Sequence, residues 1–82
     1  MNKYIIYVKE KCPFCVKAIE RLKNDNISFE KMAFDNRPAA LQELKKIYEW
    51  QTVPMVFEKV GNSTYKLIGG YTDLLVRLDG KS

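Results

Sequence analysis

Residues 3–22, with the sequence KYIIYVKEKCPFCVKAIERL, determine the fold more than any other segment of the chain. Residues 3–8 are β-branched, aromatic and almost continuously apolar, which is typical of a strand covered on both faces. After a short charged loop, Cys12 and Pro13 begin a helix, because proline suits the first helical turn, where its missing N–H would have no partner. Apolar residues then recur at helical spacing, at Cys15, Ala18, Ile19 and Leu22. A C-x-x-C motif is therefore predicted at the N-terminus of this helix.

The middle of the chain predicts a second strand and a second helix. The first helix ends at Asn24-Asp25-Asn26, and residues 27–34 then contain the alternation of a strand. Residues 35–38, which end in a proline, supply a turn and a helix start. The apolar face of this second helix carries Leu41, Leu44 and Ile47.

The last third of the chain predicts a hairpin and a short helix. Residues 55–60 and 64–68 are expected to be two strands joined by a three-residue turn. Gly69-Gly70 ends the second of these strands, and Thr72 is expected to cap a helix with Asp73 in its first turn. The order β-α-β-α-β-β-α predicts an α/β fold, a four-stranded mixed sheet flanked by helices.

Length and composition limit the possible classes of protein. The 82 residues suffice for one domain, residues 1–82, and 46% hydrophobic with 29% charged residues is ordinary for a globular chain. The longest apolar run, residues 4–8, is too short to cross a bilayer or to form the core of a secretory signal. We therefore expect a cytoplasmic protein with no membrane partner.

The residue types that are missing exclude several kinds of site. The chain has no His, which excludes Ser-His and Cys-His nucleophiles, and its two Cys are too few for a tetrahedral zinc site in one chain, so no metal is expected. The net charge of +4 suits an anionic small molecule as well as a nucleic acid. No nucleic-acid partner is expected, because the lysines near the first helix are not interleaved with aromatic residues.

Cys12 and Cys15 are predicted to be a redox pair. They lie one helical turn apart, within reach of a disulfide. The helix N-terminus and the charges of Lys9 and Lys11 favour the thiolate of Cys12, which is predicted to be the nucleophile, and Cys15 the resolving thiol. The alternatives are a structural pair and half of a zinc or iron-sulfur site shared across a dimer. A disulfide that closes a loop of only four residues would stabilise the fold little, and C-x-x-C beside a βαβ pattern favours redox chemistry.

Three motifs in the expected order give the chain a resemblance to a known family. Cys12-Pro13-Phe14-Cys15, Thr52-Val53-Pro54 and Gly69-Gly70-Tyr71-Thr72-Asp73 resemble the dithiol glutaredoxins, a branch of the thioredoxin-fold family. The resemblance covers nearly the whole chain. It implies a thioredoxin-like fold and a monomer that uses glutathione to reduce protein-glutathione mixed disulfides and protein disulfides.

The resemblance also implies which residues bind glutathione. Thr52, Val53 and Pro54 would form a loop with a cis Val53–Pro54 peptide that faces the cysteines, and Val53 would pair with the cysteinyl backbone of glutathione. The other implied glutathione-binding residues are Lys9 for the glycyl carboxylate, Phe14 as a wall, and Gly70, Thr72 and Asp73 for the γ-glutamyl zwitterion.

Several points stay open at the level of the sequence. A glutaredoxin-like reductant recharged by thioredoxin reductase and a dimeric iron-sulfur carrier that uses Cys12 are alternative functions. Phe14 stands where many members of the family have Tyr. No contact with glutathione is assigned to the second helix, where Leu41 has the relevant register, and no role is assigned to Trp50.

Overall fold

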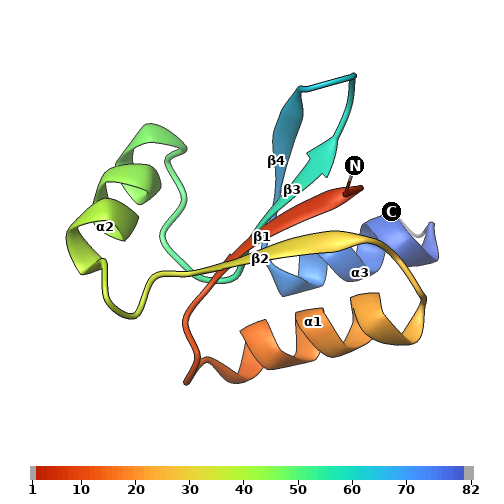
Figure 1. The fold of residues 1–82 in the computed structure, drawn as a ribbon, viewed down its shortest axis with the longest axis horizontal. Coiled ribbons are helices and arrows are strands. Elements are labelled where there is room, and N and C mark those ends of the chain that lie inside the picture. Colours follow the sequence, from red (N-terminus) through yellow and green to blue (C-terminus); the bar gives the residue numbers. More distant parts are fainter. Residues whose placement is uncertain (1, 81–82) are drawn as a thin grey trace.

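The computed structural model describes residues 2–80, and it contains the seven predicted elements in the predicted order (Figure 1). The strands are β1 (Tyr4–Val8), β2 (Phe29–Ala33), β3 (Met55–Lys59) and β4 (Tyr65–Gly69). The helices are α1 (Pro13–Asn24), α2 (Pro38–Ile47) and α3 (Tyr71–Asp79). Within residues 2–80, no helix is both long and apolar enough to span a membrane.

The four strands form one mixed sheet in the order β2-β1-β3-β4. β1 pairs with β2 in parallel, whereas the β1–β3 and β3–β4 pairs are antiparallel. The parallel pair is joined through α1, as a crossover connection requires. This arrangement confirms the predicted mixed sheet, and it puts the end of β1 beside the start of β3.

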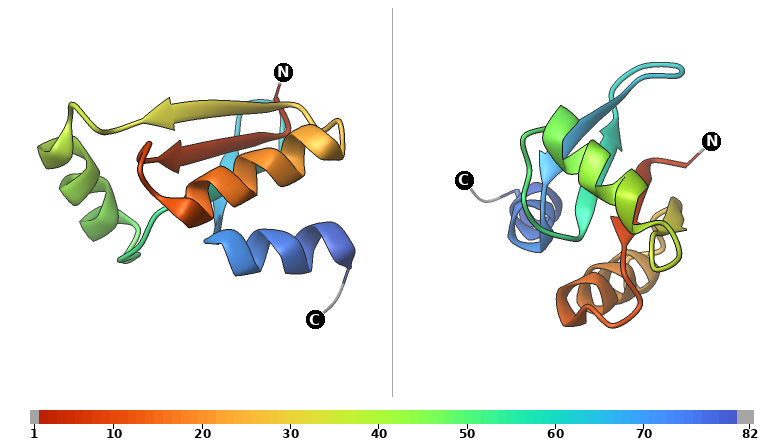
Figure 2. Two further views of the ribbon diagram at one scale, coloured as in Figure 1. Left: turned by 90° about the horizontal axis from the view of Figure 1, so that it is seen from below. Right: turned by 90° about the vertical axis from the view of Figure 1, so that its left-hand side faces the viewer.

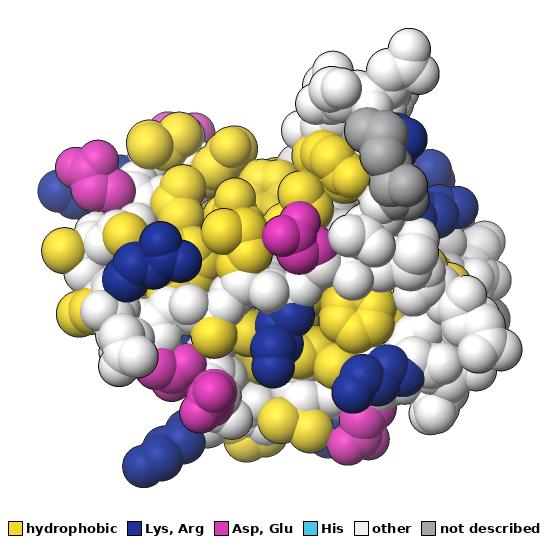
Figure 3. Space-filling model, in the orientation of Figure 1, with side chains coloured by type: hydrophobic (Ala, Val, Ile, Leu, Met, Phe, Trp, Pro, Cys, Tyr) yellow, Lys and Arg dark blue, Asp and Glu magenta, His cyan; other side chains and the backbone are white. Residues whose placement is uncertain are grey.

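The helices cover the two faces of the sheet unequally. α1 and α3 lie side by side on one face (Figures 1 and 2), where Ala18, Leu22 and Leu74 pack with the buried side chains of β1 and are 0% exposed. The other face meets only α2, through Leu41 and its neighbours. Apolar side chains remain visible on this face between α2 and the β3–β4 hairpin (Figure 3). The strand β1 is central, but only its α1/α3 face is fully buried. Ile5 and Tyr7 on the α2 face are half-buried, so the predicted cover on both faces is only partial.

The start of α3 differs from the prediction. Gly70 is the N-cap and the helix begins at Tyr71, so the prediction that Thr72 caps the helix is wrong. The cap comes from Asp73, whose Oδ2 accepts a hydrogen bond from the Gly70 N–H at 2.9 Å. A carboxylate at the third helical position can reach back in this way and replaces the expected hydroxyl cap.

The end of α2 uses a left-handed residue that is not glycine. Glu49 has φ 53°, and the Trp50 N–H donates to the Lys45 carbonyl at 3.0 Å. Glycine is common at this position, because a Cβ is unfavourable in the left-handed conformation. Glu49 therefore holds a strained turn that sets the position of Trp50.

A buried carboxylate ties β3 to β1 and α3. Glu58 accepts hydrogen bonds from the Tyr4 hydroxyl at 2.9 Å and from Arg77 Nε at 2.8 and 3.0 Å. The hydrogen bonds from Arg77 hold the pKa of Glu58 below its ordinary value against the opposing effect of burial, with help from Tyr4. Burial and the bond to Glu58 raise the pKa of Tyr4 to about 12.

Replacing Glu49 by Gly is expected to stabilise the protein. The substitution relieves the left-handed strain and should add about 1 kcal/mol to the free energy of unfolding, measured by urea denaturation. Asn26, which also has a positive φ of 55°, provides the control. Because Asn tolerates this conformation, Asn26→Gly should gain less. A Glu49→Gly protein that is less stable than the parent would contradict this interpretation of the turn.

Replacing Glu58 by Gln is expected to lower stability at neutral pH and to reduce its dependence on acid. Since the folded pKa of Glu58 is depressed, its charge stabilises the fold above the unfolded pKa of about 4.3, and this contribution is lost as the pH falls through the folded pKa. Glu58→Gln should cost about 1–3 kcal/mol near pH 7. It should also flatten the fall in melting temperature between about pH 5 and pH 2.

The matched control for Glu58→Gln is Glu43→Gln, since Glu43 is an exposed carboxylate on α2. The control should change neither the stability at neutral pH nor its slope with pH. Equal acid sensitivity in the parent and the Glu58→Gln protein would show that Glu58 does not supply the pH dependence.

Candidate active site

Cys12 is held at the N-terminus of α1. It is the N-cap residue, and its Sγ accepts a hydrogen bond from the Cys15 N–H at 3.3 Å. Its own N–H donates to the Lys9 carbonyl at 3.3 Å, which closes the turn between β1 and α1. Cys12 as a residue is half-buried. Amides and the helix dipole at this position stabilise negative charge on sulfur.

Cys15 has a different environment one turn further along α1. It is 1% exposed and belongs to the core that α1 forms with β1 and α3. Burial raises the pKa of the Cys15 thiol, and a hydrogen bond with Cys12 raises it further. Both cysteines are free thiols. The two sulfurs are thus adjacent but chemically unequal, with Cys15 kept protonated while Cys12 is free to react.

The loop before β3 faces Cys12. The Val53–Pro54 peptide bond is cis, as predicted, and the Cys12 thiol donates to the Val53 carbonyl at 3.6 Å. Val53 is half-buried, whereas Pro54 is buried. This contact joins two motifs that are separated by 41 residues in the sequence.

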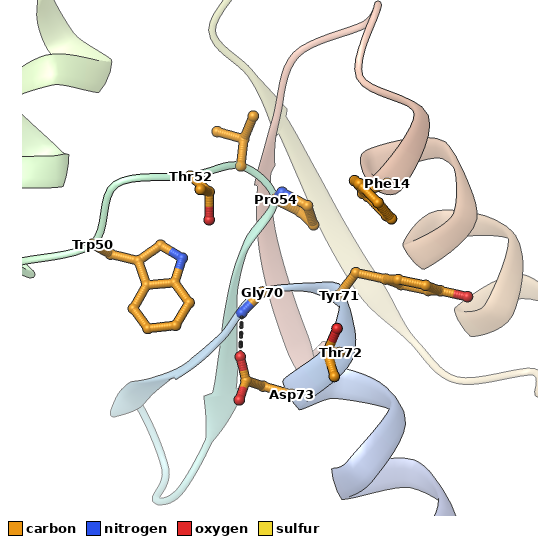
Figure 4. A pocket seen from close by; sticks show the side chains of 9 residues that line it. Phe14, Trp50, Thr52, Pro54, Gly70, Tyr71, Thr72 and Asp73 are labelled. Carbon is orange, nitrogen blue, oxygen red and sulfur yellow. Dashed lines mark hydrogen bonds between the residues drawn. The ribbon is translucent and has the colours of Figure 1, made fainter.

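A cavity of about 310 Å³ opens beside this contact (Figure 4). It brings together every predicted glutathione-binding residue except Lys9, and it adds two residues that were not predicted, Trp50 and Tyr71. In Figure 4, Phe14 and Tyr71 lie on one side of the cavity and Trp50 on the other, with Pro54 and Gly70 between them. A volume of this size suits a small ligand.

The N-terminus of α3 forms one end of the cavity. The amides of its first turn have no intrahelical partner and carry the positive end of the helix dipole. Asp73 uses one carboxylate oxygen to cap Gly70, which leaves the other for a cation. Gly69, with φ 128°, precedes the cap, and a Cβ there would overlap the Asp73 carboxylate. Gly69 therefore lets the chain turn tightly enough for Asp73 to reach the cap.

An aromatic pair of exposed Phe14 and half-buried Tyr71 forms the rim near the cysteines. The rings of Phe14 and Tyr71 are 6.0 Å apart at an angle of 34°, and the Lys17 ammonium lies 5.6 Å from the Phe14 ring. Phe14 is 55% exposed. Tyr71 shares this rim, but its hydroxyl points away from the cavity (Figure 4).

Other predicted contacts lie outside the cavity. The side chain of Lys9 is exposed and does not line the cavity, although its carbonyl shapes the Cys12 turn. On α2, Leu41 is buried in the core, so it is not available to a ligand. Among residues 2–80, no group of three or more His, Cys, Asp or Glu side chains is placed to hold a metal.

Comparison with known proteins gives consistent similarities. The Glutaredoxin family model matches residues 4–62. Glutaredoxin 3 of Escherichia coli strain K12 is 35% identical over 69 residues, which are 84% of this chain and 77% of that protein. A glutaredoxin of Pseudomonas aeruginosa is 30% identical over 74 residues, which are 90% of this chain and 82% of that protein. Wheat glutaredoxin superposes with a TM-score of 0.79 at 26% identity, over 95% of this chain and 72% of that one. The expected thioredoxin-like fold is thereby confirmed.

The two thiols are expected to react at very different rates with iodoacetamide in the reduced protein. Cys12 should be alkylated rapidly, because it is only half-buried and lies at the N-terminus of α1. Cys15 should be modified only on unfolding, since it is buried. Mass spectrometry of the parent and of the variants Cys12→Ser and Cys15→Ser measures each rate. Faster labelling of Cys15 would contradict the assignment.

Proposed function

The chain belongs to the glutaredoxin family of thiol-disulfide oxidoreductases, and we propose that it uses glutathione as its reducing co-substrate. Its substrates in this proposal are proteins that carry a mixed disulfide with glutathione and proteins with internal disulfides. A reducing compartment such as the cytoplasm supplies the glutathione, and the protein acts as a monomer.

One observation carries this proposal. The Cys12 sulfur lies 3.6 Å from the Val53 carbonyl, at the edge of a cavity that extends to the N-terminus of α3. A glutathione joined to Cys12 has its cysteinyl backbone beside Val53, where the two chains can pair as antiparallel strands. Its γ-glutamyl carboxylate then meets the first-turn amides of α3, and its ammonium meets Asp73. Exposed Lys9 is available to the glycyl carboxylate.

Removal of glutathione from a protein needs only Cys12. The Cys12 thiolate attacks the glutathione sulfur, the Cys12–glutathione disulfide forms, and the protein sulfur leaves as a thiolate that takes a proton from water. A second glutathione thiolate then attacks the sulfur of the bound glutathione. Glutathione disulfide leaves, and the Cys12 thiolate is restored.

Reduction of a protein disulfide needs both cysteines. Attack by Cys12 leaves the substrate covalently attached, with its other sulfur released as a thiol. Cys15 then gives up its proton and attacks the Cys12 sulfur. The Cys12–Cys15 disulfide forms, and the substrate sulfur leaves as a thiolate that takes up one proton in place of the one that Cys15 released. Two molecules of glutathione reduce that disulfide. Because Cys15 is buried beside Cys12, its sulfur can reach its neighbour but not an external disulfide.

Single cysteine variants assayed on both kinds of substrate test this proposal. Cys15→Ser should keep the removal of glutathione from a glutathionylated peptide, because that route does not use Cys15. With a protein disulfide, the same variant should accumulate a covalent complex that is visible on a non-reducing gel. Cys12→Ser should lose both activities.

The wild-type protein, assayed in parallel on both substrates, is the control for folding and for reagent quality. Activity on the glutathionylated peptide that survives in Cys12→Ser and disappears in Cys15→Ser would reverse the two roles. If neither variant differed from the wild type, thiol exchange at this site would be excluded.

A further inference from the structure

Trp50 carries a hydrogen-bond donor without an acceptor. Its Nε1 is shielded from solvent and has no hydrogen-bond partner among residues 2–80. Every other buried side-chain nitrogen or oxygen in that part of the chain has such a partner. A buried donor left unpaired destabilises the free protein, so such a group calls for a functional explanation. Indole donates only and cannot accept, so its partner must be an acceptor atom.

The indole forms part of the cavity wall beside Cys12. Trp50 lines the cavity from the side opposite Phe14 and Tyr71, with its ring beside Gly70 (Figure 4). Its Cζ2, on the ring edge that carries Nε1, is 3.8 Å from the point where a Cβ on Gly70 would lie. The donor edge of the ring therefore approaches the start of α3, where the unpaired backbone amides also lie.

The backbone fixes the indole in this place. Glu49 ends α2 in the left-handed conformation, and the Trp50 N–H donates to Lys45. Two residues further on, Thr52 begins the loop that reaches Cys12. Trp50 thus belongs to the same short connection as Val53 and Pro54, and its orientation is coupled to theirs.

We propose that the indole N–H of Trp50 binds the γ-glutamyl carboxylate of glutathione. This inference rests on the proposed function. Phe14, two residues from Cys12, marks the sulfur side of the cavity, and Trp50 lies on the opposite side, with Gly70, the N-cap of α3, between them. A carboxylate on that side receives the indole N–H in addition to the first-turn amides, while Asp73 holds the adjacent ammonium. Ligand binding then relieves the unpaired donor of the free protein.

Nuclear magnetic resonance tests this contact directly, because Trp50 is the only tryptophan and gives one indole N–H signal. The Cys15→Ser protein is joined at Cys12 to glutathione, to γ-glutamylcysteine or to cysteinylglycine. The first two adducts should move the indole proton downfield and slow its exchange with solvent, as expected for a hydrogen bond to a carboxylate. Cysteinylglycine, which lacks the γ-glutamyl group, should leave the signal near its position in the free protein.

Kinetics of Trp50→Phe give a second, independent measurement. Phenylalanine keeps an aromatic ring but has no N–H. KM for a glutathionylated peptide should rise on the order of tenfold, as for loss of a hydrogen bond to a charged group, with kcat nearly unchanged. A peptide disulfide with cysteinylglycine should be reduced equally by the variant and the wild type. The iodoacetamide reactivity of Cys12 shows whether the variant is folded.

The outcomes separate this inference from the proposed function. An indole signal that responds equally to all three adducts, or to none, overturns the role of Trp50, as does an unchanged KM in Trp50→Phe. A bound water that pairs with Nε1 in every state gives this result. If the wild type itself does not prefer the glutathionylated peptide over the cysteinylglycine disulfide, the proposed function fails, whatever the indole signal shows.

Discussion

The hydrogen bond from the Cys15 N–H to the Cys12 sulfur is the contact on which the chemistry of this protein depends. It fixes the first sulfur at the end of α1, where helix amides stabilise a thiolate, and it commits the second sulfur to the buried face of the same helix. That face is anchored by Ala18 and Leu22, both 0% exposed, against β1. The unequal reactivity of two identical residues therefore follows from the packing of one helix.

The sheet brings the other parts of the site to this sulfur. β1 delivers the turn that contains Cys12, and its antiparallel neighbour β3 begins directly after Pro54. β4, the next strand, ends at Gly69 and leads into α3, so the first turn of α3 reaches the same edge. Three segments that are far apart in the sequence thus form one cavity. Glu58 contributes to the alignment, because it holds β3 to both β1 and α3.

Local patterns in the sequence predict most of the fold. The β-branched run of β1, the helical spacing after Pro13 and the two glycines before α3 depend on near neighbours, so the order of elements could be predicted. The cis Val53–Pro54 peptide and most of the cavity residues were expected only from the resemblance to the dithiol glutaredoxins. The cap of α3 was mispredicted, because the Asp73 carboxylate competes with the Thr72 hydroxyl and only geometry decides between them.

Other features depend on contacts that a sequence does not reveal. Glu58 appears in the sequence as an ordinary charged residue of a hairpin, and its buried partner Tyr4 lies 54 residues away. The unpaired indole of Trp50 is visible only once α2, the loop and Gly70 are placed together. The most direct test of glutathione dependence is turnover of a glutathionylated peptide by the wild-type protein with NADPH and alternative reductants. Sustained turnover is expected with glutathione and glutathione reductase, whereas turnover sustained only by thioredoxin reductase would contradict the proposed use of glutathione.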